Sequence, residues 1–169
     1  MNLEETFSYK NTLMEHLCSN ERIVHLITKN EHAAIPNHNL AYTQVFPCEW
    51  VPETIGDSKT YICFDVDIAS VPNKTYYLPV MYVWVFTHKS NLRVPMEMGG
   101  GLTVDRVSVE IDKMLNGNRF YGLGDLKLSA MKRFTPVTGW HGRVIVYATK
   151  DFNRPSGRIF APSNRQEGV

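Results

Sequence analysis

The chain has 169 residues, of which 43% are hydrophobic and 21% are charged, a composition typical of a globular protein and not of a disordered one. Lys and Arg together number 18 against 17 Asp and Glu, so the net charge is close to zero. This balance argues against a dedicated nucleic-acid-binding protein, which usually carries a strong basic excess. It also leaves little electrostatic repulsion to oppose self-association, and therefore permits an oligomer.

The three cysteines, Cys18, Cys48 and Cys63, form no C-x-x-C motif, and no histidine pair lies at zinc-binding spacing from them. Reduced thiols in a cytoplasmic protein are therefore favoured over a disulfide. Residues 1–10 lack the apolar run of a signal peptide, and the sequence contains no stretch of about 18 apolar residues. We therefore expect no membrane span.

Apolar residues recur at helical spacing between Leu3 and Cys18, which predicts an amphipathic helix. Ser19 or Asn20 can cap a second, short helix that ends near Lys29. The predicted apolar stripe of this second helix consists of Ile23, Val24, Leu26 and Ile27.

The next segment, Asn30–Lys59, contains Pro36, Pro47 and Pro52 and shows no sustained periodicity. It predicts a long extended loop with a short strand near Tyr42–Phe46. Loops of this length in a compact domain are usually functional or contact a partner.

Strict alternation of side chains over Thr60–Ile68 predicts a half-buried strand, and Val71–Lys74 has the composition of a turn. Leu78–Thr87 is apolar on both faces, which predicts a central strand covered on both sides. One cover is expected to be the helix that follows, and the other to be the N-terminal helices or an adjacent subunit. In the predicted strand Thr60–Ile68, one face carries Ile62, Phe64, Val66 and Ile68, and the other carries Tyr61, Cys63, Asp65 and Asp67.

Gly99–Gly101 predicts a flexible hinge before a helix that Thr103 caps and that ends at Leu115. Asn116-Gly117 supplies a left-handed stop for this helix. A second hairpin, Leu126–Met131 with Arg143–Thr149, follows through a turn containing Thr135-Pro136 and Gly139. The buried stripe predicted for the helix is Val104, Val107, Ile111, Met114 and Leu115.

The predicted fold class is therefore α+β: a small mixed or antiparallel sheet of two β-hairpins, with an intervening helix and N-terminal helices. We expect one domain over residues 1–152, including the loop at residues 30–59, and an irregular C-terminal tail over residues 153–169.

Two groups of carboxylates could hold a metal ion. Asp65 and Asp67 lie on one face of a strand, but the sequence places no third ligand beside them, so a solvated strand face is favoured. Asp112, Asp125 and Lys127 have the residue types of a metal-dependent nuclease, in which two carboxylates bind the metal and a lysine orients water. A chance match is favoured here too, and we expect no metal and no cofactor.

The histidines and glycines suggest no catalytic group. His88 and His141 could meet at the ends of the hairpins, but no Ser or Cys nucleophile accompanies them. Gly99–Gly101 precedes a helix, yet the Gly-Lys-Ser/Thr of a phosphate loop does not follow.

Aromatic and basic side chains cluster in the second hairpin, where Tyr147 accompanies them, and at other hairpin ends and loops. Such residues could stack on nucleic acid, but the charge balance makes protein contact the better interpretation. The candidate subunit or partner interface consists of Phe46, Trp50, Arg93, Arg133, Phe134, Trp140, His141, Arg143, Phe152 and Arg154.

Several blocks between Val45 and Arg154 form an ordered series over about two-thirds of the chain. They are Phe46-Pro47, Trp50–Thr54, Lys59–Asp67, Tyr82–His88, Val104–Arg106, Glu110–Gly117, Gly122–Gly124, His141–Arg143 and Asp151–Arg154.

In these blocks the chain resembles the neck and tail-terminator family of tailed phages of Gram-positive bacteria, also called tail-completion or head-tail joining proteins. The resemblance implies a virion protein, assembled in the host cytoplasm, that forms a ring, expected to be hexameric. It implies that this ring caps the tail tube, joins it to the head connector and lets DNA pass through its lumen without specific binding. It implies no catalytic residue and no membrane association. The Gly99–Gly101 segment and the C-terminal tail do not map onto the family pattern.

Two alternatives stay open at this point. The protein could be another virion part, such as a head-tail adaptor or a component of the distal end, or, less favoured, the metal-dependent nuclease with Asp112, Asp125 and Lys127.

Overall fold

The computed structural model describes residues 3–50, 58–70 and 78–149. None of the helices in these ranges has the length and apolar character needed to span a bilayer. The turn predicted at residues 71–74 and the tail from residue 153 lie outside the described residues. The helices and strands, in chain order, are α1 (Leu3–Ser19), α2 (Glu21–Thr28), η1 (His38–Leu40), β1 (Val45–Phe46), β2 (Thr60–Ser70), β3 (Leu78–His88), η3 (Lys89–Asn91), η4 (Met96–Met98), α3 (Thr103–Leu115), β4 (Leu126–Phe134) and β5 (Trp140–Thr149).

The five strands form one sheet in the order β1-β2-β3-β5-β4. β1 runs parallel to β2, and the other neighbouring pairs are antiparallel. The sheet is therefore mixed, β3 is its central strand, and the two predicted hairpins, β2–β3 and β4–β5, are both present. This confirms the predicted α+β class and the central position of Leu78–Thr87.

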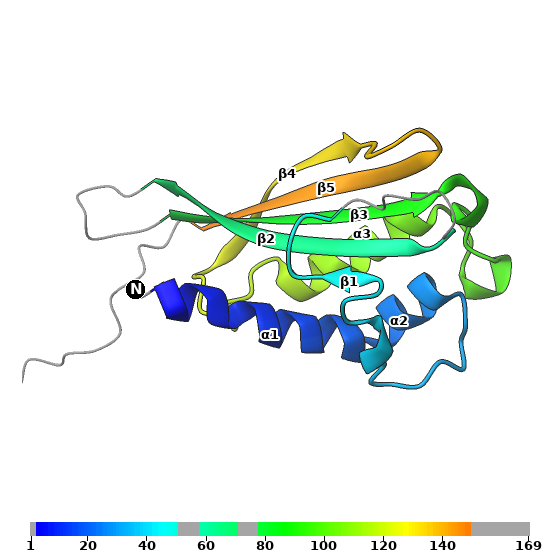
Figure 1. Ribbon diagram of the computed structural model, residues 1–169, viewed down its shortest axis with the longest axis horizontal. Helices are drawn as coiled ribbons and strands as arrows, with labels where there is room; N and C mark the ends of the chain where they lie inside the picture. The colour runs from blue at the N-terminus through cyan, green and yellow to red at the C-terminus, as the bar shows by residue number, and fades with distance from the viewer. Residues whose placement is uncertain (1–2, 51–57, 71–77, 150–169) are drawn as a thin grey trace, which may run out of the picture.

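The three α-helices lie on the same face of this sheet (Figure 1). The N-terminal pair forms as predicted: the Asn20 side chain caps α2 by accepting a hydrogen bond of 3.1 Å from the Ile23 amide, and the predicted stripe of α2 is buried. The expectation that the N-terminal helices cover the second face of β3 is therefore wrong. We call the helix-bearing side of the sheet the covered face and the opposite side the outer face.

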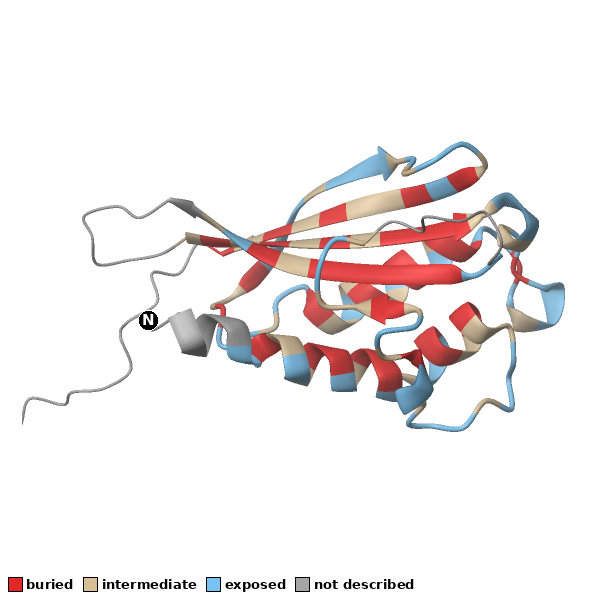
Figure 2. Cartoon of the chain, in the orientation of Figure 1, coloured by how far each residue is buried: buried red, intermediate tan, exposed pale blue. Residues whose placement is uncertain are grey.

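The main core lies between the covered face and the helices, as the buried stripes of Figure 2 show. Phe64 of β2, Met81 and Val83 of β3, and Ile145 of β5 are at most 1% exposed. α3 buries its predicted stripe against them, with Met114 only partly buried. Burial of this kind supplies the main driving force of folding, at roughly 25 cal/mol per Å² of apolar surface.

The prediction that β2 is half-buried is wrong at its start. Tyr61 and Cys63, which point to the outer face, are 2% and 0% exposed. They are covered by Phe46 and Trp50 from the preceding loop and by Trp140 of β5. A contact so distant in sequence leaves no trace in the alternation of β2.

The segment before α3 also differs from expectation. Leu102, not Thr103, occupies the N-cap position, and no side chain caps the helix there. The Thr103 hydroxyl donates instead to the Asn91 carbonyl at 2.9 Å and accepts a hydrogen bond from Lys29 Nζ. Gly99–Gly101 all adopt positive φ, and Arg106 donates hydrogen bonds to the Gly99 and Gly100 carbonyls. Hydrogen bonds thus fix the segment for which the sequence predicted a flexible hinge.

Candidate functional site

Most of the aromatic residues predicted to lie at an interface meet in one cluster at one end of the outer face. We call Phe46, Trp50, Tyr61, Phe86, Phe134 and Trp140 the aromatic cluster. The rings of Phe46 and Trp50 stack with centroids 4.4 Å apart, and Tyr61 lies 4.8 Å from Trp50. Such contacts contribute about 0.5–1.5 kcal/mol each beyond the area they bury.

The aromatic cluster divides the predicted interface residues into two kinds. Trp140 is 1% exposed, so its side chain packs within the subunit and stabilises the cluster. Phe46, Trp50 and Phe134 are only partly buried and form the accessible margin of the cluster. Tyr147, also considered for stacking, is fully buried on the covered face and donates a hydrogen bond to Asp112 at 3.1 Å. Burial and the neighbouring Asp112 carboxylate raise the pKa of Tyr147 far above its usual value.

Gly142 allows the aromatic cluster to close. A Cβ atom at this position would lie 2.6 Å from the Val85 carbonyl oxygen and 2.7 Å from Cβ of Phe86. Both distances are shorter than van der Waals contact, so a larger residue would push β5 away from β3 at their register position Phe86–Gly142. Packed with the same aromatic rings, the Cys63 thiol donates to the Trp50 carbonyl at 3.6 Å, and burial raises the pKa of this thiol to about 12. A thiol held neutral in this way is a poor nucleophile.

Three of the predicted basic residues, Arg133, His141 and Arg143, gather at the same end of the sheet as the aromatic cluster but on the covered face. Arg133 and Arg143 are register partners on β4 and β5. Together with His141 they surround a shallow hollow that Leu102 and Val104 also line. Arg143 Nε donates to Asp105 Oδ1 of α3 at 2.9 Å, whereas Arg133 and His141 are exposed. Arg93 is exposed on the neighbouring loop, whereas Phe152 and Arg154 lie outside the described residues.

Three of the four carboxylates weighed as metal ligands, Asp65, Asp112 and Asp125, have protein partners, and the fourth, Asp67, is exposed. Asp65 accepts hydrogen bonds from the Tyr9 hydroxyl at 3.3 Å and pairs with Lys10 Nζ at 3.0 Å. Asp125 pairs with Lys127 at 3.2 Å and with Arg119 at 3.7 Å. In the described part of the chain, no three His, Cys, Asp or Glu side chains are grouped to hold a metal ion.

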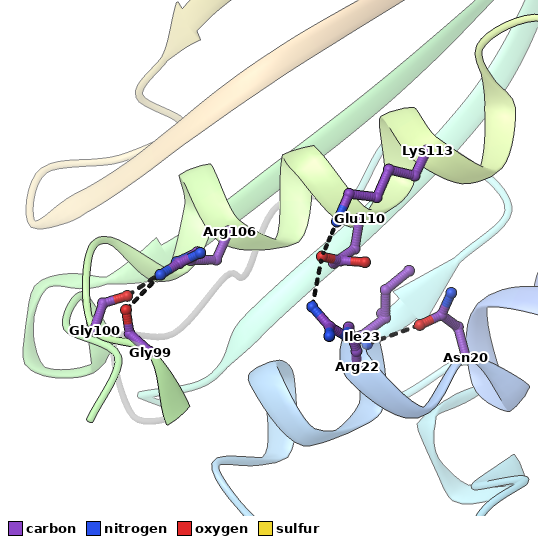
Figure 3. Close-up of polar contacts among 8 residues, drawn as sticks. All are labelled: Asn20, Arg22, Ile23, Gly99, Gly100, Arg106, Glu110 and Lys113. Carbon is purple, nitrogen blue, oxygen red and sulfur yellow. Dashed lines mark hydrogen bonds and ion pairs between the residues drawn. The ribbon is translucent and has the colours of Figure 1, made fainter. Parts of the chain in front are cut away.

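The structure also has a cleft of about 570 Å³ between α2 and the start of α3, which the sequence did not reveal. It is lined by four glutamates, Glu21, Glu31, Glu97 and Glu110, and by Arg22 and Arg106. Figure 3 shows how these cations are held: Arg22 pairs with Glu110 at 3.6 Å, and Arg106 binds the glycine carbonyls. His25, also in the lining, has a buried Nε2 without a partner among the described residues. The residues of this cleft come from segments about 75 positions apart, so no local sequence motif predicts the cleft.

The fold and these surfaces define an α+β protein that presents an aromatic margin, a basic hollow and one sheet face on which no described helix lies. A model of the YomW family matches residues 20–149, which is most of the chain. The chain therefore belongs to the YomW family, a phage-type family.

No curated protein matches the chain. Among solved structures, the chain is similar to one from the virion of a native gene transfer agent particle, with 16% identity and a TM-score of 0.39. The similarity covers 63% of this chain and 76% of that one.

Proposed function

We propose that this protein is a non-enzymatic structural component of a tailed-phage virion, and specifically a ring-forming tail-terminator or neck subunit that joins the tail tube to the head connector. The observation that carries the proposal is the outer face. Tyr82, Trp84, Val144 and Val146 lie there half-buried, and the described helices lie only on the opposite face (Figures 1 and 2). An apolar sheet face of this kind is typical of an assembling subunit. The phage-type family and the ordered sequence blocks support the same proposal.

Ring assembly explains why the chain would carry accessible aromatic and basic margins. A subunit in a closed ring buries two different surfaces against its two neighbours, and cyclic symmetry stops further growth. We propose a hexamer whose contacts use Phe46, Trp50, Phe134, Arg133, His141 and Arg143, with Arg93, Phe152 and Arg154 at further contacts with the tail tube or the connector. The near-neutral charge suits a lumen through which DNA slides without specific binding.

The same proposal gives the polar residues structural roles. Asp112 accepts a hydrogen bond from the Tyr147 hydroxyl. Asp125 forms ion pairs with Lys127 and Arg119. Neither a cofactor nor a membrane enters the proposed role, which is carried out at the neck of the virion after assembly in the host cytoplasm.

Imaging of virions tests the proposal directly. We expect antibody-labelled protein at the junction of head and tail, and we expect phage lacking the gene to release unjoined heads and tails. Native mass spectrometry of the purified protein alone, and after mixing with tail tubes, would give the size of the ring. A protein that stays monomeric and binds no tail tube would contradict the proposal.

The alternatives predict different results in the same experiments. Label at the distal end of the tail would indicate a distal component, and normal tails that fail only to join heads would indicate an adaptor. Mg²⁺-dependent DNA cleavage that disappears in Asp125→Ala would indicate the nuclease.

A further inference from the structure

Besides β1, which has only two residues, β2 and β4 each have an edge with which no other described strand pairs along most of its length. β4 is the last strand in the order. The outward backbone groups of Leu126 and Leu128 bond to the Asn116–Asn118 segment, and from Ala130 to Phe134 no other described strand pairs with this side. At the opposite end, β1 pairs only with Ile62 and Cys63, so no described strand pairs with this side of β2 from Phe64 onward; the Val66 amide there donates to the Asp65 side chain at 2.9 Å. A free edge exposes backbone N–H and C=O groups that can pair with another strand.

The two free edges carry opposite charges. On the β2 edge Asp67 is exposed, and on the β4 edge Lys132 and Arg133 are exposed. The side chains of Asp67 and Lys132 make no hydrogen bond or ion pair with another described residue. Asp65, by contrast, is already paired with Lys10. The charges that remain available are therefore negative on one edge and positive on the other.

We propose that the β4 edge of one subunit pairs antiparallel with the free β2 edge of the next copy of this chain, so that the sheets join around the ring. This inference rests on the proposed ring and names the contact that builds it. Because β2 and β4 run in opposite directions within the sheet, a neighbour related by rotation about an axis along the strands presents its β2 antiparallel to β4.

The register follows from the bulges and from β1. Irregularities after Ile68 in β2 and after Leu128 in β4 leave Phe64–Ile68 and Ala130–Phe134 as the regular stretches. Placing Lys132 opposite Asp67 also places Met131 opposite Ile68. A shift of two residues, with Lys132 opposite Asp65, would bring Phe134 against Cys63, where Phe46 of β1 already pairs.

Both cross-strand pairs in this register are favourable. Lys132 and Asp67 are opposite charges on the outer face, and Met131, which is 45% exposed, gains an apolar partner on the covered face. Pairing of two β4 edges would instead bring Lys132 and Arg133 of both chains together. The charges therefore select the head-to-tail contact, which closes into a ring, over a two-fold contact, which stops at a dimer.

Charge reversal tests the contact in purified protein. Lys132→Glu and Asp67→Lys each place like charges across the edge, so the concentration for half-assembly should rise at least about tenfold, since such juxtaposition is strongly unfavourable. The double variant Lys132→Glu/Asp67→Lys restores opposite charges and should restore assembly. An equimolar mixture of the two single variants should also assemble, with alternating subunits. Lys89→Glu is the matched control, because Lys89 is exposed and lies on neither edge. Thermal unfolding confirms that each variant is folded.

Disulfide trapping tests the same contact inside virions. In a Cys48→Ser background, which removes the exposed native thiol, Lys132→Cys/Asp67→Cys should give a ladder of cross-linked subunits up to the full ring. Lys132→Cys alone should give no cross-link, and a dimer from it would overturn the proposal by revealing a β4–β4 contact. Protein present in virions without cross-links, and with rings that tolerate charge reversal, would overturn this contact while the proposed function stands. Protein absent from virions would overturn both.

Discussion

The two faces of the sheet differ in what covers them more than in what they are made of. On the covered face, Phe64, Met81 and Ile145 lie under the helices and are completely buried. On the outer face, Tyr82 and Trp84 are comparably apolar but remain partly exposed. A monomer gains little stability from a large apolar side chain that it leaves half in water. The difference therefore indicates that the covered face provides most of the stability of the fold, whereas the outer face is free to make the contacts that the proposed ring requires.

The strongest test of this difference compares two aromatic truncations at adjacent register positions. Phe64, opposite Val83, is fully buried on the covered face, and Tyr82, opposite Asp65, lies on the outer face. Phe64→Ala should lower the free energy of unfolding by about 3–5 kcal/mol. Tyr82→Ala should lower it by less than half as much, because its ring already meets solvent. Urea titration of both variants measures the difference, and equal losses would show that the outer face is also part of the monomer core.

The aromatic cluster is where the outer face resembles a core, and Gly142 probes it. Gly142→Ala places a methyl group against the Val85 carbonyl and Phe86, so we expect a loss of about 1–3 kcal/mol from overpacking. Trp140 and Trp50 lie in the same cluster, so their fluorescence should shift to the red in the folded variant. Unchanged stability and fluorescence would mean that the cluster is loosely packed. Ser129→Ala, at an exposed position on β4, is the neutral control.

The regular elements could be predicted from the sequence because their signals are local. The 3.6-residue period of α2 and α3 and the two-residue period of β2 each result from one buried face. Asn20 and Gly117 marked helix ends because a cap and a positive φ are properties of single residues. Even the strand ends differ little from the predicted ones: β4 continues three residues beyond Met131, and β5 begins three residues before Arg143.

The sequence could not predict which element covers which face. A helix period says that one face is buried but not against what, so α1 and α2 could be assigned to either side of β3. Because aromatic residues next to arginines are typical of interfaces, the sequence places Trp140 in a candidate interface and Tyr147 beside it. Both side chains are instead buried by contacts from distant segments. The acidic cleft between α2 and α3 was missed for the same reason.

The buried tyrosines of the covered face, Tyr9 and Tyr147, should make the free energy of unfolding depend on pH in the alkaline range. Burial, followed by the Asp65 and Asp112 carboxylates, raises the pKa of Tyr9 and Tyr147 above the unfolded value of about 10. The folded state thus holds these protons more tightly, and their stabilising effect is complete below pH 10. Above pH 10 stability should fall by up to about 1.4 kcal/mol per pH unit for each tyrosine.

Tyr147→Phe should therefore reduce the slope of the free energy of unfolding against pH, above pH 10, by up to about 1.4 kcal/mol per pH unit, the contribution of one proton. At pH 7 the same variant should be less stable by about 1 kcal/mol, because it loses the hydrogen bond to Asp112. Chemical denaturation at pH 7 and pH 11 measures both effects. A wild-type protein whose stability does not change between pH 10 and pH 11 would contradict this assignment.

The smallest expected effect concerns the ion pair at the margin of the covered face. Nε of Arg143 in β5 lies 2.9 Å from Oδ1 of Asp105 in α3. The two side chains are 36% and 44% exposed, so solvent screens the attraction between them. Asp105→Asn should lower the free energy of unfolding by less than about 1 kcal/mol, and the loss should shrink further in high salt. A salt-independent loss of several kcal/mol would mean that this pair, and not the apolar stripe beneath it, holds α3 on the sheet. Because Val107 and Ile111 of that stripe are completely buried, we expect the helix to stay docked when the ion pair is removed.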